Sequence, residues 1–238
     1  MIRSFRQSSA RAFTLIELLI VISIIAIIAG FSIPAVTSVL KGSALTQGGT
    51  VLTDQMSMAR QHALGNNRIV QVRIYRFGDP EVPGEKLDDP SSGQFRAIQY
   101  FERSPGGIWS PVGKLARLPD TIIMNSDKRF STILGEDNTT RLVLSTKVQA
   151  DPNNHIELPR DVKFNYDYVY FHFLPNGGTD LKSTGNSGSP SSGGLWHITI
   201  HALADLPKAT GVTNPPNYFC WMVDPVTGVG RVYRPSVK

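Results

Sequence analysis

Glu17 is the one charged residue in an apolar stretch that runs from residue 13 to residue 34. A carboxylate near the middle of a bilayer costs about 2.5–3.5 kcal/mol, and Glu17, one helical turn inside the run, costs less. The charge is either tolerated at a membrane interface or paired with a cation. If the chain were cut before Phe13, its new α-amino group would be cationic near neutral pH. The Glu17 of one subunit could then pair with the Phe13 amine of a neighbour and fix the axial register of a helical bundle.

Metal-binding side chains are the next candidates for chemistry. His197 and His201 fall on one face of a predicted strand, with backbones about 13 Å apart, so this pair alone cannot hold one zinc ion. Loop residues offer oxygen ligands of the kind that calcium uses, but turn formation is the preferred interpretation: Asp79, Asp88, Asp89, Asp151, Asn153 and Asn154. The sequence predicts no bound metal and no cofactor.

Nucleic-acid binding has weak support. The formal charge is +5, but without Arg3, Arg6 and Arg11 the balance is 21 basic against 19 acidic residues, or +2. A basic tail remains at the C-terminus: Arg231, Arg234 and Lys238. Three such charges could each meet a phosphate in modest, salt-sensitive binding, and a solvated tail is the alternative.

Catalytic patterns are absent from the sequence. No HExxH, CxxC, P-loop or GxSxG occurs, and Cys220 is the one cysteine, so no internal disulfide can form. An aromatic-rich segment at residues 162–173 could serve as a stacking platform for single strands, but it lacks interleaved basic residues. Core packing is therefore the preferred interpretation, and we do not expect an enzyme.

Residues 13–40 are expected to form a membrane-spanning helix, because about 20 apolar helical residues cross a bilayer. Arginines at positions 3, 6 and 11 precede the run without any acid, which keeps that end in the cytoplasm. A secretory signal cut near Ala29 is the alternative and would free a soluble domain. The apolar run exceeds the usual 7–15 residues of such a signal.

The helix is expected to continue through residues 41–66, with a kink at Pro34. An apolar face recurs at helical spacing at Leu45, Leu52, Met56, Ala59 and Ala63. The break at residues 65–67, Gly-Asn-Asn, predicts the helix end, because these residue types accept left-handed backbone angles.

The remaining residues, 67–238, predict a β-rich domain, so the expected fold class is α+β: a long N-terminal helix packed on an antiparallel sheet. Alternating or aromatic patterns predict strands at 68–77, 94–101, 162–173, 195–203, 218–223 and 229–233, with shorter candidates at 121–124 and 142–144. The residues 224–228 predict the turn of a closing hairpin.

The segment that starts at Ala12 and runs through Phe13 to Leu19 resembles the class III signal sequence of type IV pilins and type II secretion pseudopilins. In that family a basic leader is cut before a Phe, whose amine is then methylated. The resemblance places the cut between Ala12 and Phe13, the methyl group on Phe13, and assembly roles on Glu17 and Pro34. The family prefers Gly where this sequence has Ala12.

Two further segments resemble the H-type minor pseudopilins. One is the helix end at residues 54–63 with the strand after it, and the other is the turn at 174–178. The resemblance implies a leader at 1–12 and a periplasmic head at 67–238, with the N-terminus in the cytoplasm and the helix in the inner membrane. It implies a structural subunit of a pseudopilus, with a prepilin peptidase and other pseudopilin subunits as partners. A DNA-binding minor pilin and a tethered or secreted carbohydrate-binding or enzymatic domain are the alternatives.

Overall fold

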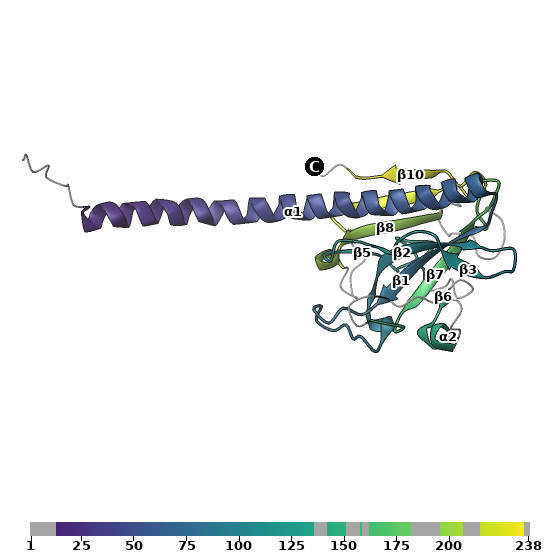
Figure 1. Cartoon of the computed structure of the whole chain (residues 1–238). Coiled ribbons are helices and arrows are strands. Elements are labelled where there is room, and N and C mark those ends of the chain that lie inside the picture. Colours follow the sequence, from purple (N-terminus) through teal and green to yellow (C-terminus); the bar gives the residue numbers. More distant parts are fainter. Residues whose placement is uncertain are drawn as a thin grey trace, which may run out of the picture. The chain divides into compact units, whose positions relative to one another are not determined.

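The computed structural model describes residues 13–135, 142–150, 158, 162–181, 196–206 and 215–235, with only the backbone of residues 30–38, 149 and 150. The chain divides into two compact units, Met1–Lys41 and Gly42–Lys238. We call the second unit the head. Figure 1 shows the helices and strands of both units.

Helix α1 (Leu15–Asn66) has 52 residues and supplies the described part of the first unit as well as one element of the head. The helix continues without a break through Pro34. The helix ends where the sequence predicted: Asn67 has a left-handed φ of 53°, and the Arg68 N–H donates to the Ala63 carbonyl at 3.2 Å.

The head portion of α1 packs through the predicted apolar face. All five residues of that face are buried in the main hydrophobic core: Leu45, Leu52, Met56, Ala59 and Ala63. This confirms that the helical spacing of apolar residues after the predicted membrane segment marks a face that packs on the sheet.

Gly48 and Gly49 let α1 approach the sheet closely. A Cβ built on Gly49 would lie 2.5 Å from the ring of Phe219, and one on Gly48 would lie 3.1 Å from Ile122. The two glycines weaken the helix locally, but their missing side chains make room for the strands.

Gly49→Ala is expected to destabilise the head by about 1–3 kcal/mol, because the added methyl group overpacks against Phe219. Gly42→Ala is the matched control, since nothing lies within 4 Å of its added Cβ; alanine should there be neutral or stabilising by up to about 1 kcal/mol. Denaturant unfolding of the two variants measures the difference. Equal stabilities would show that Phe219 moves aside without cost.

The described residues of the head form one ten-stranded sheet whose paired strands are all antiparallel. The order along its main path is β10-β9-β8-β5-β2-β1-β7-β6, and β3 and β4 also pair with β2. The strands are β1 (Val70–Phe77), β2 (Gln94–Arg103), β3 (Trp109–Pro111), β4 (Ala116–Arg117), β5 (Ile122–Met124), β6 (Leu142–Val143), β7 (Asp167–Phe173), β8 (Trp196–Ala202), β9 (Tyr218–Val223) and β10 (Gly230–Tyr233).

The predicted α+β class is confirmed, with α1 packed on an antiparallel sheet. Both faces of β1 are buried, although its sequence alternates between apolar and polar residues. The main core lies between α1 and one face. A second cluster, which includes Tyr75, Phe101 and Tyr168, covers residues of the other face and takes Val148 from the short helix α2 (Ser145–Ala150).

The predicted hairpin of β1 and β2 and the closing hairpin of β9 and β10 are confirmed. The aromatic strand begins at Asp167 and not at residue 162, because a turn precedes it. Lys163 has a left-handed φ of 49°, and the Asn165 N–H donates to the Val162 carbonyl at 2.9 Å. The sequence did not predict five short elements: strands β3 and β4, helix α2 and the 3-10 turns at Pro90–Ser92 and Leu203–Asp205.

Candidate functional site

Reciprocal hydrogen bonds between Thr14 and Glu17 fix the start of α1. The Glu17 N–H donates to Thr14 Oγ1 at 3.2 Å, and Glu17 Oε2 accepts from the Thr14 N–H and hydroxyl, both at 2.9 Å. This is a capping box, which satisfies two N–H groups that the first turn of a helix leaves open. This local partner of Glu17 was not predicted, although Thr-x-x-Glu before an apolar run is a sequence signal for a capping box.

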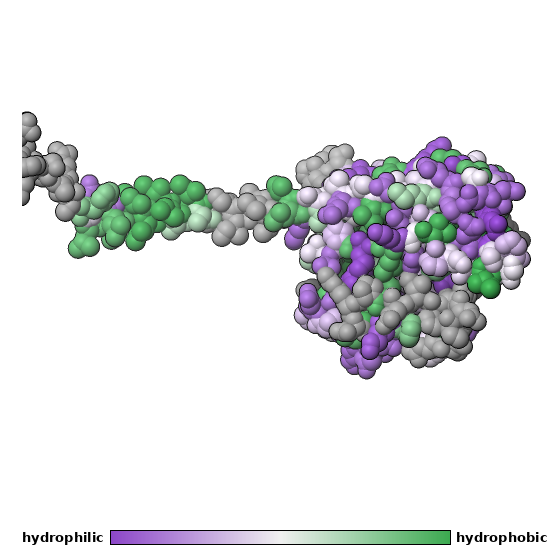
Figure 2. Space-filling view, in the orientation of Figure 1, coloured by the Kyte–Doolittle hydropathy of each residue, from purple (hydrophilic) through white to green (hydrophobic). Residues whose placement is uncertain are grey.

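The apolar side chains behind this cap remain unburied. From Phe13 to Ile28, the exposed fraction of the large hydrophobic side chains lies between 45% at Val21 and 88% at Leu15. Figure 2 shows the described part of this segment as an apolar surface. A surface of this kind marks contact with a membrane or with other protein chains.

Two predicted site positions near the N-terminus lie partly or wholly outside the described residues. Ala12, on the leader side of the predicted cut, is not described. Pro34 lies within α1, but its side chain, like those of the other residues from 30 to 38 in the predicted membrane segment, is outside the description.

Within the described part of the chain, none of the helices combines the length and the apolar character needed to cross a membrane.

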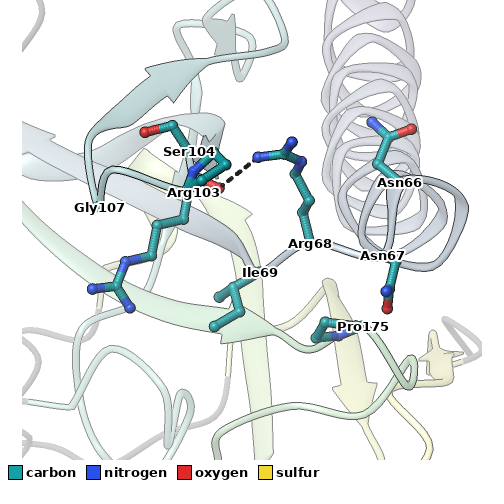
Figure 3. Close-up of a pocket in the computed structure, with 9 residues that line it drawn as sticks. Asn66, Asn67, Arg68, Ile69, Arg103, Ser104, Gly107 and Pro175 are labelled. Carbon is teal, nitrogen blue, oxygen red and sulfur yellow. Dashed lines mark hydrogen bonds between the residues drawn. The ribbon is translucent and has the colours of Figure 1, made fainter.

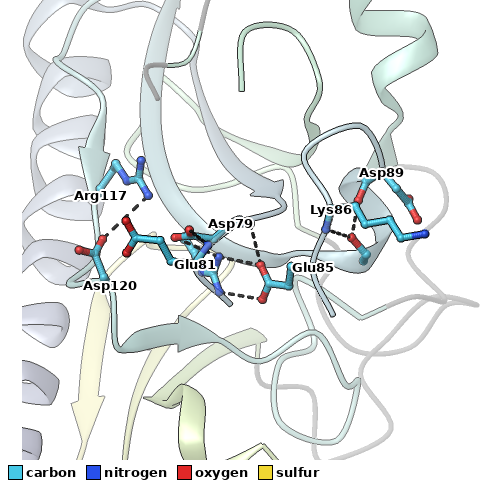
Figure 4. Close-up of polar contacts among 9 residues, drawn as sticks. Asp79, Glu81, Glu85, Lys86, Asp89, Arg117 and Asp120 are labelled. Atoms are coloured by element: carbon cyan, nitrogen blue, oxygen red, sulfur yellow. Dashed lines mark hydrogen bonds and ion pairs between the residues drawn. The ribbon is translucent and has the colours of Figure 1, made fainter. Parts of the chain in front are cut away.

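Figure 4 shows Asp79, Glu81 and Glu85 in the acidic loop after β1. The buried Arg96 of β2 organises this loop. Arg96 is 2% exposed and donates from both terminal nitrogens to Glu85, with N–O distances of 2.8 Å. Asp79 Oδ2 lies 3.7 Å from the same guanidinium, and Asp79 Oδ1 accepts the Glu81 N–H at 3.1 Å. Neither Arg96 nor Glu85 was singled out in the sequence, because the pair joins the loop to β2.

The other predicted calcium candidates divide between turns and undescribed residues. Asp89 caps the turn Pro90–Ser92 by accepting the Ser91 N–H at 3.0 Å. This supports the turn-forming interpretation for Asp89, and Asp88 is exposed beside it. Residues 151, 153 and 154 lie outside the described part. Among the described residues, no three His, Cys, Asp or Glu side chains come together as metal ligands.

The two histidines of β8 each have a structural partner. His201 is fully buried, with Nδ1 2.8 Å from the Ala202 carbonyl and Nε2 2.9 Å from the Asn125 amide. Burial lowers the pKa of His201. His197 Nδ1 lies 3.3 Å from the Thr132 hydroxyl. These contacts tie β8 to the segment after β5.

Two residues of the predicted basic tail, Arg231 and Arg234, lie in the described part of the chain. Arg231 lies exposed on β10, the last strand of the sheet order. Arg234 donates from Nη1 to the Thr46 hydroxyl at 2.8 Å and so joins the tail to α1. Lys238 lies outside the description.

A hollow of about 480 Å³ opens beside the end of α1 (Figure 3). Two arginines, Arg68 and Arg103, are among its lining residues, but their guanidinium groups point in different directions. Arg68 Nε pairs with Glu102 at 2.9 Å, and Glu102 also lies 2.6 Å from His62 Nε2. The hydrogen bond from His62, more than the charge of Arg68, lowers the pKa of Glu102. The cluster ties the end of α1 to β2 and pairs Arg68, one of the two arginines of the hollow, with a carboxylate.

Comparison with known protein families finds a match for the N-terminal segment of the chain. Residues 7–33 match the family model described as the prokaryotic N-terminal methylation motif. The minor pseudopilin EpsH from the type 2 secretion system of Vibrio cholerae is a structural match with 8% sequence identity and a TM-score of 0.38, over 81% of this chain and 97% of that chain. No curated protein matches the sequence. The chain thus carries a prokaryotic N-terminal methylation motif at residues 7–33, followed by a long helix whose later part packs on an antiparallel sheet.

Proposed function

We propose that the chain is a minor pseudopilin of a type II secretion system or a related pilus system, a structural subunit and not an enzyme. The observation that carries the proposal is the unburied apolar surface of residues 13–29 directly behind the methylation motif. A helix of this kind has two places to bury its side chains: the lipid of the inner membrane and the helices of other subunits.

Processing comes first in the proposed sequence of events. The basic leader, residues 1–12, keeps the N-terminus in the cytoplasm, and the head reaches the periplasm. A prepilin peptidase cuts between Ala12 and Phe13, and the new Phe13 amine is methylated. The cut is compatible with the capping box, because both of its residues lie on the mature side.

Assembly then moves the apolar helix out of lipid and against its neighbours. In the uncut chain, the Glu17 carboxylate accepts hydrogen bonds from Thr14 but has no cation beside it in the described residues. In the filament, the cationic Phe13 amine of a neighbouring subunit supplies that charge. Burial of an ion pair is tolerated when geometry and hydrogen bonds are good, and loss of one partner then costs several kcal/mol.

The experiment that tests the proposal is identification of the first residue of the membrane-bound protein by mass spectrometry. A methylated Phe13 is the expected result, and an uncut Met1 or a start beyond Ala29 would contradict it.

A further inference from the structure

A small pocket lies on the sheet face that α1 does not cover. Its volume is about 270 Å³, and three aromatic side chains, one amide and one ammonium group line it together with two valines. The polar and aromatic members are Gln71, Trp109, Lys147, Tyr168 and Tyr170. They come from β1, β3, α2 and β7, so the fold of the head brings together residues that are far apart in sequence.

A chain of hydrogen bonds holds the Gln71 amide in one orientation. Asp180 Oδ2 lies 2.8 Å from His172 Nδ1, and His172 Nε2 lies 3.1 Å from Gln71 Nε2. Gln71 Oε1 accepts from Arg73 Nε at 2.6 Å. Because the Nδ1–H of His172 donates to the Asp180 carboxylate, Nε2 is the acceptor in the neutral ring, and the nitrogen of the Gln71 amide faces it. The second N–H of that nitrogen is therefore available to the pocket.

The aromatic walls are also held in place. The Trp109 ring stacks on His172 with a centroid distance of 5.3 Å and an interplanar angle of 24°. The buried Arg73 guanidinium lies 4.8 Å from the centre of the Tyr168 ring. A site whose walls are fixed by packing and hydrogen bonds binds with less loss of conformational freedom.

The polar groups at the pocket are hydrogen-bond donors, one of them charged. Lys147 is exposed and makes no ion pair with any described residue. Tyrosine hydroxyls and the Gln71 N–H suit hydroxyl oxygens, aromatic rings suit a flat apolar face, and an ammonium group suits a carboxylate. We propose that this pocket binds one pyranose unit that carries a carboxylate, with Lys147 on the carboxylate and Gln71 on a ring hydroxyl.

The test is a titration of the full chain with D-glucuronate, in a detergent that has no sugar head group. Trp109 is the optical reporter, because Trp196 and Trp221 are buried in the core on the other side of the sheet. We expect a saturable change in tryptophan fluorescence. Calorimetry should show that glucose binds about tenfold or more weakly than glucuronate, which is the effect of one charge-assisted hydrogen bond. Acetate, which lacks the ring, should not bind.

Lys147→Gln should remove the preference for glucuronate over glucose, whereas Lys114→Gln, an equal charge change at another exposed lysine, should retain it. Trp109→Phe should abolish the fluorescence change but leave calorimetric binding detectable. The proposal is overturned if glucuronate does not bind at millimolar concentration, if glucose binds as tightly, or if free glutamate binds as well as glucuronate. Unchanged binding in Lys147→Gln would also overturn it.

Discussion

Glu17→Gln is expected to prevent incorporation of the subunit into a filament, while the start of α1 and the fold of the head stay intact. Glutamine keeps the capping box, because its amide oxygen accepts the same hydrogen bonds from Thr14. It removes only the negative charge that we assign to the Phe13 amine of the neighbour. A charge left unpaired in a dehydrated bundle costs about 3–5 kcal/mol, so the filament fraction should fall by a factor of about 100 or more.

Thr14→Ala is the matched variant, because it removes the cap and keeps the charge. We expect a loss of about 1 kcal/mol at the helix start and incorporation close to that of the unmodified subunit. Sedimentation of sheared filaments, with immunodetection of the subunit, measures both variants. If Glu17→Gln assembled normally and Thr14→Ala did not, Glu17 would act as a helix cap and not as a charge partner.

Arg96→Met is expected to cause the largest loss of stability in the head, about 3–5 kcal/mol, because it leaves a carboxylate in a buried place without its cation. Glu85 is 5% exposed at its side chain and depends on Arg96 for both of its 2.8 Å contacts, while Asp79 lies at the edge of the same guanidinium. Thermal and denaturant unfolding of the full chain measure the loss.

Arg129→Met gives the surface comparison. Arg129 pairs with Asp127 and lowers the pKa of that carboxyl, but the Arg129 side chain is 49% exposed. Its removal should cost at most about 1 kcal/mol. In the double variant Arg96→Met/Glu85→Gln, part of the stability should return, since one buried charge is gone. Equal losses of unfolding free energy in Arg96→Met and Arg129→Met would contradict this account. Water would then reach the acidic loop, and the Arg96–Glu85 pair would behave as a surface ion pair.

The sequence was sufficient where one periodic pattern controls one element. The spacing of Leu45, Leu52 and Met56 predicted the buried face of α1, because a helix presents every third or fourth residue to the same side. The alternation of Val70, Val72 and Ile74 predicted β1, and the hairpin expected with the next strand is confirmed by its antiparallel pairing with β2.

The features that were not predicted from the sequence depend on contacts between distant residues or on competing local signals. Arg96 and Glu85 meet only when a loop folds onto a strand, and the Asp180–His172–Gln71 chain joins two strands. The turn at Lys163 was hidden by an aromatic run that is typical of a strand. The capping box has a sequence signal, Thr14 three residues before Glu17, but the same Glu17 also fits a charge partner in a neighbouring subunit.

The first residue of the mature membrane-bound protein tests the central claim most directly. Mass spectrometry of the N-terminal peptide should find N-methylated Phe13, with Ala12 and the basic leader removed. That result would establish prepilin processing in a chain with Ala12 before the cut. A peptide that still begins at Met1 would leave an uncut chain, and a start beyond Ala29 would make the head a secreted domain; either would contradict assembly through the Glu17 and Phe13 pair.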